Sequence, residues 1–95
     1  MDKAGLIELF TENYPDYAKR SIVTWSHACL RLSRSQGKDS ISFEDLKMYD
    51  VVNQFLLTVT SRNSQKTIAN GLRKLAAIQG DEEVVKYYED IYDDI

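Results

Sequence analysis

Two stretches of this sequence concentrate basic residues and contain no acidic ones. Residues 19–38 and 61–80 lack Asp and Glu, although the 95-residue chain carries a net charge of −3. Lys and Arg clustered in this way are typical of surfaces that bind phosphate groups. The residues that would form such a surface are Arg31, Arg34, Lys38, Arg62, Lys66, Asn70, Arg73 and Lys74. If both stretches face one groove, they predict a salt-sensitive interaction with about four to six phosphates of DNA.

Residues 81–95 have the opposite character, with seven acidic residues and a single lysine, Lys86. Such a segment either keeps a protein in solution or forms a surface that opposes or mimics a nucleic acid. The residues of that surface would be Glu82, Glu83, Glu89, Asp90, Tyr92 and Asp93. The alternative function is therefore a small acidic adaptor or inhibitor that binds a protein partner through its C-terminal helix. A third interpretation, solvated helix faces without any partner, stays open as well.

No residues in the chain have the types and spacing of a catalytic, cofactor or metal site. His27 is the only histidine, and no Cys and His spacing suits zinc. No Gly-rich loop that could cradle a phosphate is present. Cys29 is the only cysteine, so it forms no intramolecular disulfide and fits a reducing, cytoplasmic environment. We therefore expect neither enzyme activity nor a cofactor, a metal or a membrane span.

The strongest helix signal covers residues 64–79, within the second basic stretch. Ser64 is expected to cap its first turn, and Gly80 to end it in the left-handed conformation. Gly71 is unusual in a helix interior, and it predicts close packing against the third helix. One apolar face of this helix is formed by Ile68, Leu72, Leu75 and Ile78, which follow one another at steps of four, three and three residues.

The first basic stretch begins within a second long helix, expected at residues 16–35. Pro15 separates this helix from a first one at residues 2–13. Its buried seam is predicted to consist of Ile22, Trp25, Cys29 and Leu32. A polar stripe on another side contains Arg20, Thr24, His27, Arg31 and Arg34. The helix of residues 64–79 has a polar stripe too, formed by Lys66, Asn70, Arg73 and Lys74. Whether the two stripes share a face depends on how the two helices cross.

Two more helices complete the expected fold. The third, at residues 42–59, starts with a near capping box of Ser42 and Asp45. It is the most apolar helix and is expected at the centre of the core. The last starts at Asp81, whose negative charge suits a helix N-terminus. The sequence thus predicts an all-α single domain of four or five helices over 1–95, with a core bundle at about 5–79 and an acidic helix at 81–95.

Several of these features together resemble a known domain. They are Leu6–Phe10, Ser21–Thr24, Ile41–Leu46, Ser64–Thr67, Ile68, Leu72 and Leu75. Their order is similar to that in the N-terminal core-binding domain of phage integrases and other tyrosine recombinases, a SAM-like domain of four helices. The resemblance implies that the second and fourth helices meet DNA.

The chain also departs from that family. The recombinase catalytic domain is absent, and the usual aromatic residue in the middle of the second helix is displaced to Trp25. The acidic segment after Gly80 is unusual for a domain that embraces DNA. The resemblance therefore implies non-catalytic DNA binding of a phage or mobile-element type. The DNA sequence, any protein partner and the oligomeric state stay open.

Overall fold

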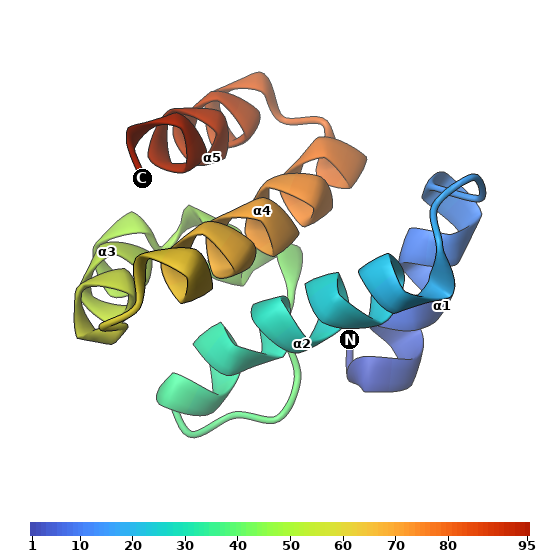
Figure 1. The fold of residues 1–95 in the computed structure, drawn as a ribbon, viewed down its shortest axis with the longest axis horizontal. Coiled ribbons are helices and arrows are strands. Elements are labelled where there is room, and N and C mark those ends of the chain that lie inside the picture. Colours follow the sequence, from blue (N-terminus) through green and yellow to red (C-terminus); the bar gives the residue numbers. More distant parts are fainter.

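Five α-helices and one short 3₁₀ helix make up the fold in the computed structural model, which describes all of residues 1–95 (Figure 1). The chain contains no strand, so the predicted all-α single globule is confirmed. Its radius of gyration is 12.1 Å. The elements are α1 (Lys3–Asn13), α2 (Lys19–Ser35), η1 (Phe43–Lys47, the 3₁₀ helix), α3 (Tyr49–Thr58), α4 (Arg62–Gln79) and α5 (Glu82–Asp94).

Polar side chains fix the starts of several helices. Asp2 accepts a hydrogen bond from the Gly5 N–H at the start of α1, and Asp81 accepts one from the Glu83 N–H at the start of α5. The predicted cap at Ser64 is wrong, because the Ser61 hydroxyl instead accepts the Ser64 N–H at 3.3 Å. Helix α4 therefore begins earlier, at Arg62. Its predicted end is confirmed, since Gly80 has a φ of 80°.

The second helix also differs from its predicted bounds. It begins at Lys19 rather than at residue 16, because Pro15 lies in a turn that the Tyr17 N–H closes by donating to the Tyr14 carbonyl at 3.2 Å. The turn lets the chain reverse between α1 and α2. No side chain caps α2.

The prediction of a single third helix at 42–59 is wrong, because the helix is interrupted at Met48 and divided into η1 and α3. The capping box of Ser42 and Asp45 is present, but it starts η1. The carbonyl of Leu46 accepts the buried Tyr88 hydroxyl at 2.6 Å, and this bond replaces one that a continuous α-helix would supply. A contact with α5 thus accompanies the break.

Helices α2 and α4 form the centre of the molecule, with α1 packed on α2 and α5 on α4 (Figure 1). The predicted seam of α2 is buried throughout, and so are Ile68, Leu72 and Leu75 of α4, whereas Ile78 is half-buried. The prediction that the third helix lies at the centre is wrong. It packs at the edge, where 80% of Leu57 is exposed. Helix α5 adds Val84 and Tyr88 to the core.

Candidate nucleic-acid interface

The two basic stretches meet where α2 and α4 pack against each other. A Cβ atom at Gly71 would lie 2.7 Å from the Cβ of Ala28 and 3.0 Å from the carbonyl oxygen of Trp25. The close approach that we predicted for Gly71 is therefore present, but its partner is α2 and not the third helix. A side chain at this position would force the helices apart, so glycine sets the distance between them.

The crossing places the polar stripes of both helices on one outer face. The helices run beside each other in opposite directions (Figure 1). Gly71 contacts Ala28, and Lys74, one turn later in α4, lies over Trp25, one turn earlier in α2. Both apolar faces point into the same core. Because the two helices lie beside each other and each buries one side in this core, the sides that face away from the core lie beside each other as well.

This shared face carries basic groups that no carboxylate neutralises. On α2 the residues Arg20, Arg31 and Arg34 are exposed, and none of them makes an ion pair. Thr24 and His27 lie between them and are exposed as well. On α4 the exposed side includes Thr67, with Asn70 and Lys74 half-buried beside it. We refer to Arg20, Thr24, His27, Arg31, Arg34, Thr67, Asn70 and Lys74 as the α2–α4 face.

Lys74 is held by aromatic rings. Its Nζ lies 4.9 Å, 4.7 Å and 5.1 Å from the ring centroids of Tyr14, Tyr17 and Trp25. It also lies 3.3 Å from the Tyr17 hydroxyl. The three rings contact one another edge to face, and the Tyr14 hydroxyl donates to the Lys74 carbonyl at 3.2 Å. Ring faces attract a cation without neutralising it, so Lys74 keeps its positive charge at the surface.

The Tyr14 phenol in this cluster stays protonated at neutral pH. Burial raises the pKa of Tyr14, and the neighbouring Tyr17 raises it further, against an opposite effect of Arg73. A neutral hydroxyl is needed to donate to the Lys74 carbonyl. The ring cluster was missed at the level of the sequence, because Tyr14 and Lys74 lie far apart in the chain.

Lys66 and Arg73 point towards α5 and not onto the open part of the α2–α4 face. Lys66 Nζ lies 4.0 Å from the centre of the Tyr92 ring, and Arg73 Cζ lies 4.1 Å from it. Lys66 also donates to the Tyr92 carbonyl at 3.0 Å, and Arg73 donates to the Asn70 side-chain oxygen at 2.7 Å. The Nε of Arg73 is buried and has no partner in the protein. Two of the expected phosphate ligands thus help to attach α5.

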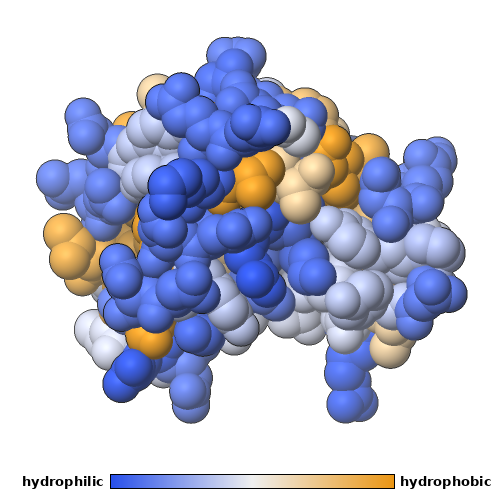
Figure 2. Space-filling view, turned by 90° about the horizontal axis from the view of Figure 1, so that it is seen from above, coloured by the Kyte–Doolittle hydropathy of each residue, from blue (hydrophilic) through white to orange (hydrophobic).

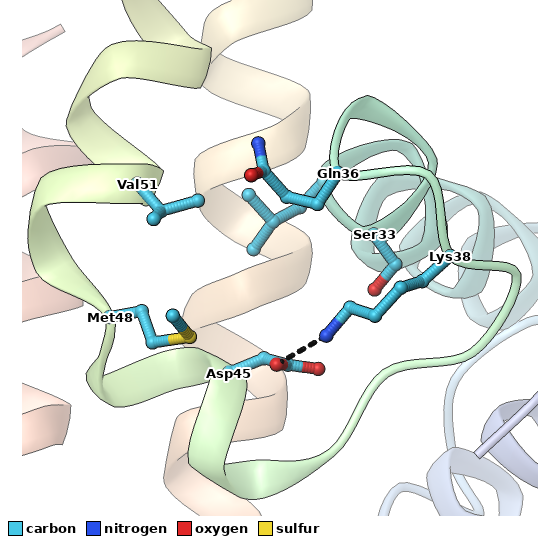
Figure 3. Close-up of a pocket in the computed structure, with 7 residues that line it drawn as sticks. Ser33, Gln36, Lys38, Asp45, Met48 and Val51 are labelled. Atoms are coloured by element: carbon cyan, nitrogen blue, oxygen red, sulfur yellow. Dashed lines mark hydrogen bonds and ion pairs between the residues drawn. The ribbon is translucent and has the colours of Figure 1, made fainter.

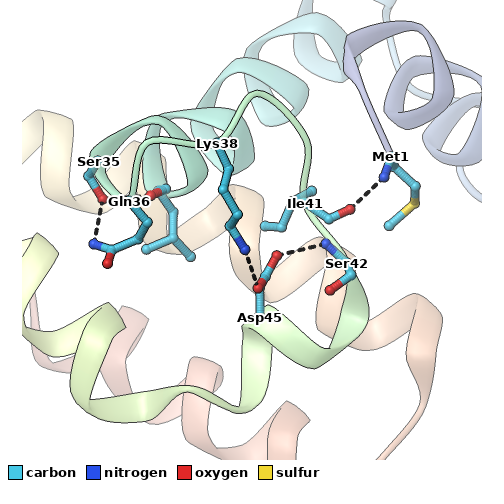
Figure 4. Close-up of polar contacts among 8 residues, drawn as sticks. Met1, Ser35, Gln36, Lys38, Ile41, Ser42 and Asp45 are labelled. Atoms are coloured by element: carbon cyan, nitrogen blue, oxygen red, sulfur yellow. Dashed lines mark hydrogen bonds and ion pairs between the residues drawn. The ribbon is translucent and has the colours of Figure 1, made fainter.

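Lys38 and Arg62 lie apart from the other basic residues. Lys38 Nζ lies 2.6 Å from the Asp45 carboxylate, in the loop between α2 and η1 (Figure 4). Burial acts to raise the pKa of Asp45, but Lys38 and the Ser42 N–H outweigh it, so the pKa lies below its usual value. Lys38 is therefore neutralised locally. Arg62 is exposed in the first turn of α4 and makes no ion pair.

The predicted acidic surface on α5 borders the basic face. Glu82, Glu83, Glu89, Asp90 and Asp93 are exposed, and only Asp90 is in an ion pair, with Lys86 at 3.3 Å. Glu89 shares a shallow pocket with Tyr14, Arg73 and Lys74. Tyr92, expected on this surface, is half-buried against α4. The side of the molecule on which α5 lies is largely hydrophilic, with scattered apolar groups (Figure 2).

Comparison with known proteins gives no assignment, because no family model, curated protein or solved structure matches this chain. The resemblance to the integrase core-binding domain therefore stays a prediction. No group of three or more His, Cys, Asp or Glu residues is placed to hold a metal ion. None of the helices combines the length and apolar character that crossing a membrane requires.

Proposed function

We propose that this protein is a non-catalytic DNA-binding module that contacts phosphates through the α2–α4 face. The observation that carries the proposal is the crossing at Gly71, which brings two acid-free helix surfaces onto one side of the molecule. Arg31 and Arg34 contribute free guanidinium groups, and Lys74 contributes an ammonium held by rings. Such groups bind the DNA backbone by releasing its counterions.

The face fits about three to five phosphates, fewer than the whole basic set would allow. Arg20, Arg31, Arg34 and Lys74 are its free cations, whereas Lys66 and Arg73 hold Tyr92 and Lys38 holds Asp45. Thr67 and Asn70 lie on the same side of α4 as Lys74 and supply hydrogen bonds to phosphate or base edges. The carboxylates of α5 repel DNA on one side and so limit the contact to α2 and the adjoining strip of α4.

The test is binding of the purified protein to a short labelled duplex of random sequence at several salt concentrations. We expect the affinity to fall steeply between about 50 mM and 200 mM salt, and each of Arg31→Ala and Arg34→Ala to reduce the salt slope by about one. Lys86→Ala on α5 is the matched control and should leave the slope unchanged. Absence of binding at low salt would overturn the proposal, and so would equal effects of all three variants.

A second candidate is binding of a basic protein partner through α5. It is favoured by the exposed carboxylates of Glu82, Glu83, Glu89 and Asp93, which form no ion pair within the chain. Replacing these four residues by Gln or Asn separates the two functions while keeping the buried side of α5. This variant should bind DNA more tightly under the first function and lose its partner under the second.

A further inference from the structure

A partly enclosed pocket of about 210 Å³ lies between the end of α2 and the start of α3, away from the α2–α4 face (Figure 3). Its apolar wall consists of Leu32, Met48 and Val51. Met48 and Val51 lie at the break, where η1 and α3 are joined by a bend instead of a continuous helix. A cavity of about 150 Å³ with an apolar lining is large enough to hold benzene. The pocket therefore has room for one ring and a substituent.

The pocket also contains a buried hydroxyl without a partner. Ser33 lines it and is 2% exposed, and its Oγ makes no hydrogen bond to any protein group. Ser26, two turns earlier on the same helix, is equally buried, but its Oγ donates to the Ile22 carbonyl at 2.9 Å. A buried hydroxyl left unpaired costs free energy that a ligand with a matching polar group recovers.

The remaining polar groups of the pocket indicate a neutral ligand. The Lys38 ammonium and the Asp45 carboxylate face the pocket as a pair 2.6 Å apart, and Asp45 also accepts the Ser42 N–H at 2.9 Å (Figure 4). Their charges cancel, and both groups already have partners. A charged ligand would have to break this pair, whereas a neutral one needs only to satisfy the Ser33 hydroxyl.

We propose that this pocket binds a phenol, with the ring against Leu32, Met48 and Val51 and the hydroxyl hydrogen-bonded to Ser33 Oγ. A phenol joins one apolar ring to one neutral polar atom, as the lining requires. The phenol is either a free small molecule or the tyrosine side chain of a peptide. This site is independent of DNA binding, because Ser33 points inward from α2 while Arg31 and Arg34 are exposed.

The test compares p-cresol with toluene, which has the same ring and methyl group but no hydroxyl, in NMR titrations of the full chain. We expect p-cresol to shift the signals of Ser33, Met48 and Val51 and to bind about five- to tenfold more tightly than toluene. In Ser33→Ala this preference should fall below about twofold. Ser26→Ala is the matched control and should keep the preference.

Equal affinities of p-cresol and toluene for the wild-type protein would overturn the proposal, and so would shifts confined to other parts of the molecule. Loss of the preference in Ser26→Ala as well would also overturn it, because the effect would then not depend on the pocket. If p-cresol behaves as expected, a capped tyrosine peptide identifies the source of the phenol. Binding of the peptide at the same signals indicates a partner's tyrosine, and its exclusion indicates a free phenol.

Discussion

Helix α4 packs against α2 on one side and α5 on the other, and the two contacts are built in different ways. Against α2 it presents Gly71, and the helix backbones approach each other closely at Ala28. Against α5 it presents the long side chains of Lys66 and Arg73, which lie on the Tyr92 ring. The α2 contact depends on small residues, so it leaves the flanking basic side chains free. The α5 contact uses basic side chains as part of the packing.

The comparison explains why residues of one type on one helix have different surroundings. Lys74 lies on the α2 side and reaches rings at the edge of that contact, where it stays at the surface. Lys66 lies on the α5 side and donates to the Tyr92 carbonyl. The position of a basic residue around the helix therefore decides whether it is free to meet a phosphate. A count of charges along the chain does not reveal this.

The largest effect is expected from breaking the α2 contact with Gly71→Val. Any Cβ at this position meets Ala28 at 2.7 Å and backbone at 3.0 Å, so the helices must separate. We expect the free energy of unfolding to fall by about 3 kcal/mol in urea denaturation. Ala77→Val, at an exposed position of the same helix, is the control and should cost about 0.5 kcal/mol. A Gly71→Val protein as stable as this control would show that the helices do not pack closely.

A smaller effect is expected from breaking the α5 contact with Tyr92→Ala. The variant loses one ring that attracts two cations, and we expect it to lower the stability by about 1 kcal/mol. It also removes the ring contacts of Lys66 and Arg73, while Lys66 keeps its bond to the backbone carbonyl and Arg73 its bond to Asn70. DNA binding under the proposed function should therefore become slightly tighter. Tyr92→Phe keeps the ring and the backbone carbonyl and should behave as the wild-type protein in urea denaturation and duplex binding. Tighter DNA binding by Tyr92→Phe as well would contradict this explanation.

The sequence was sufficient for features that depend on local pattern. The seam of Ile22, Trp25, Cys29 and Leu32 follows from helical periodicity, and the end of α4 follows from the glycine that can adopt a positive φ. Features that depend on distant contacts were not predictable. The break at Met48 coincides with the Tyr88 hydroxyl on the Leu46 carbonyl, a bond between residues that only the tertiary fold brings together.

The candidate site shows the same division. That residues 19–38 and 61–80 are basic and acid-free is visible in the sequence, and so is the anomaly of Gly71. The partner of Gly71 was not predictable, because periodicity fixes which side of a helix is buried but not what covers it. For the same reason the sequence could not show that Lys38 pairs with Asp45 and Lys66 with Tyr92, and that these two lysines are not free charges at the surface.

The smallest effect on stability is expected from Lys74→Met, which removes the charge and keeps an apolar chain against Tyr14, Tyr17 and Trp25. A half-exposed cation over aromatic rings contributes about 0.5 kcal/mol, so urea denaturation should change little. Under the proposed function, however, the variant loses a phosphate contact, and its salt slope for DNA should fall by about one. Lys66→Met is the matched substitution on the α5 side of the helix. It loses a hydrogen bond to Tyr92 and should cost more stability but leave the salt slope unchanged. If Lys66→Met reduced the slope as much as Lys74→Met, the side of α4 would not determine which lysine meets DNA, and the Tyr92 contact would have to open when DNA binds.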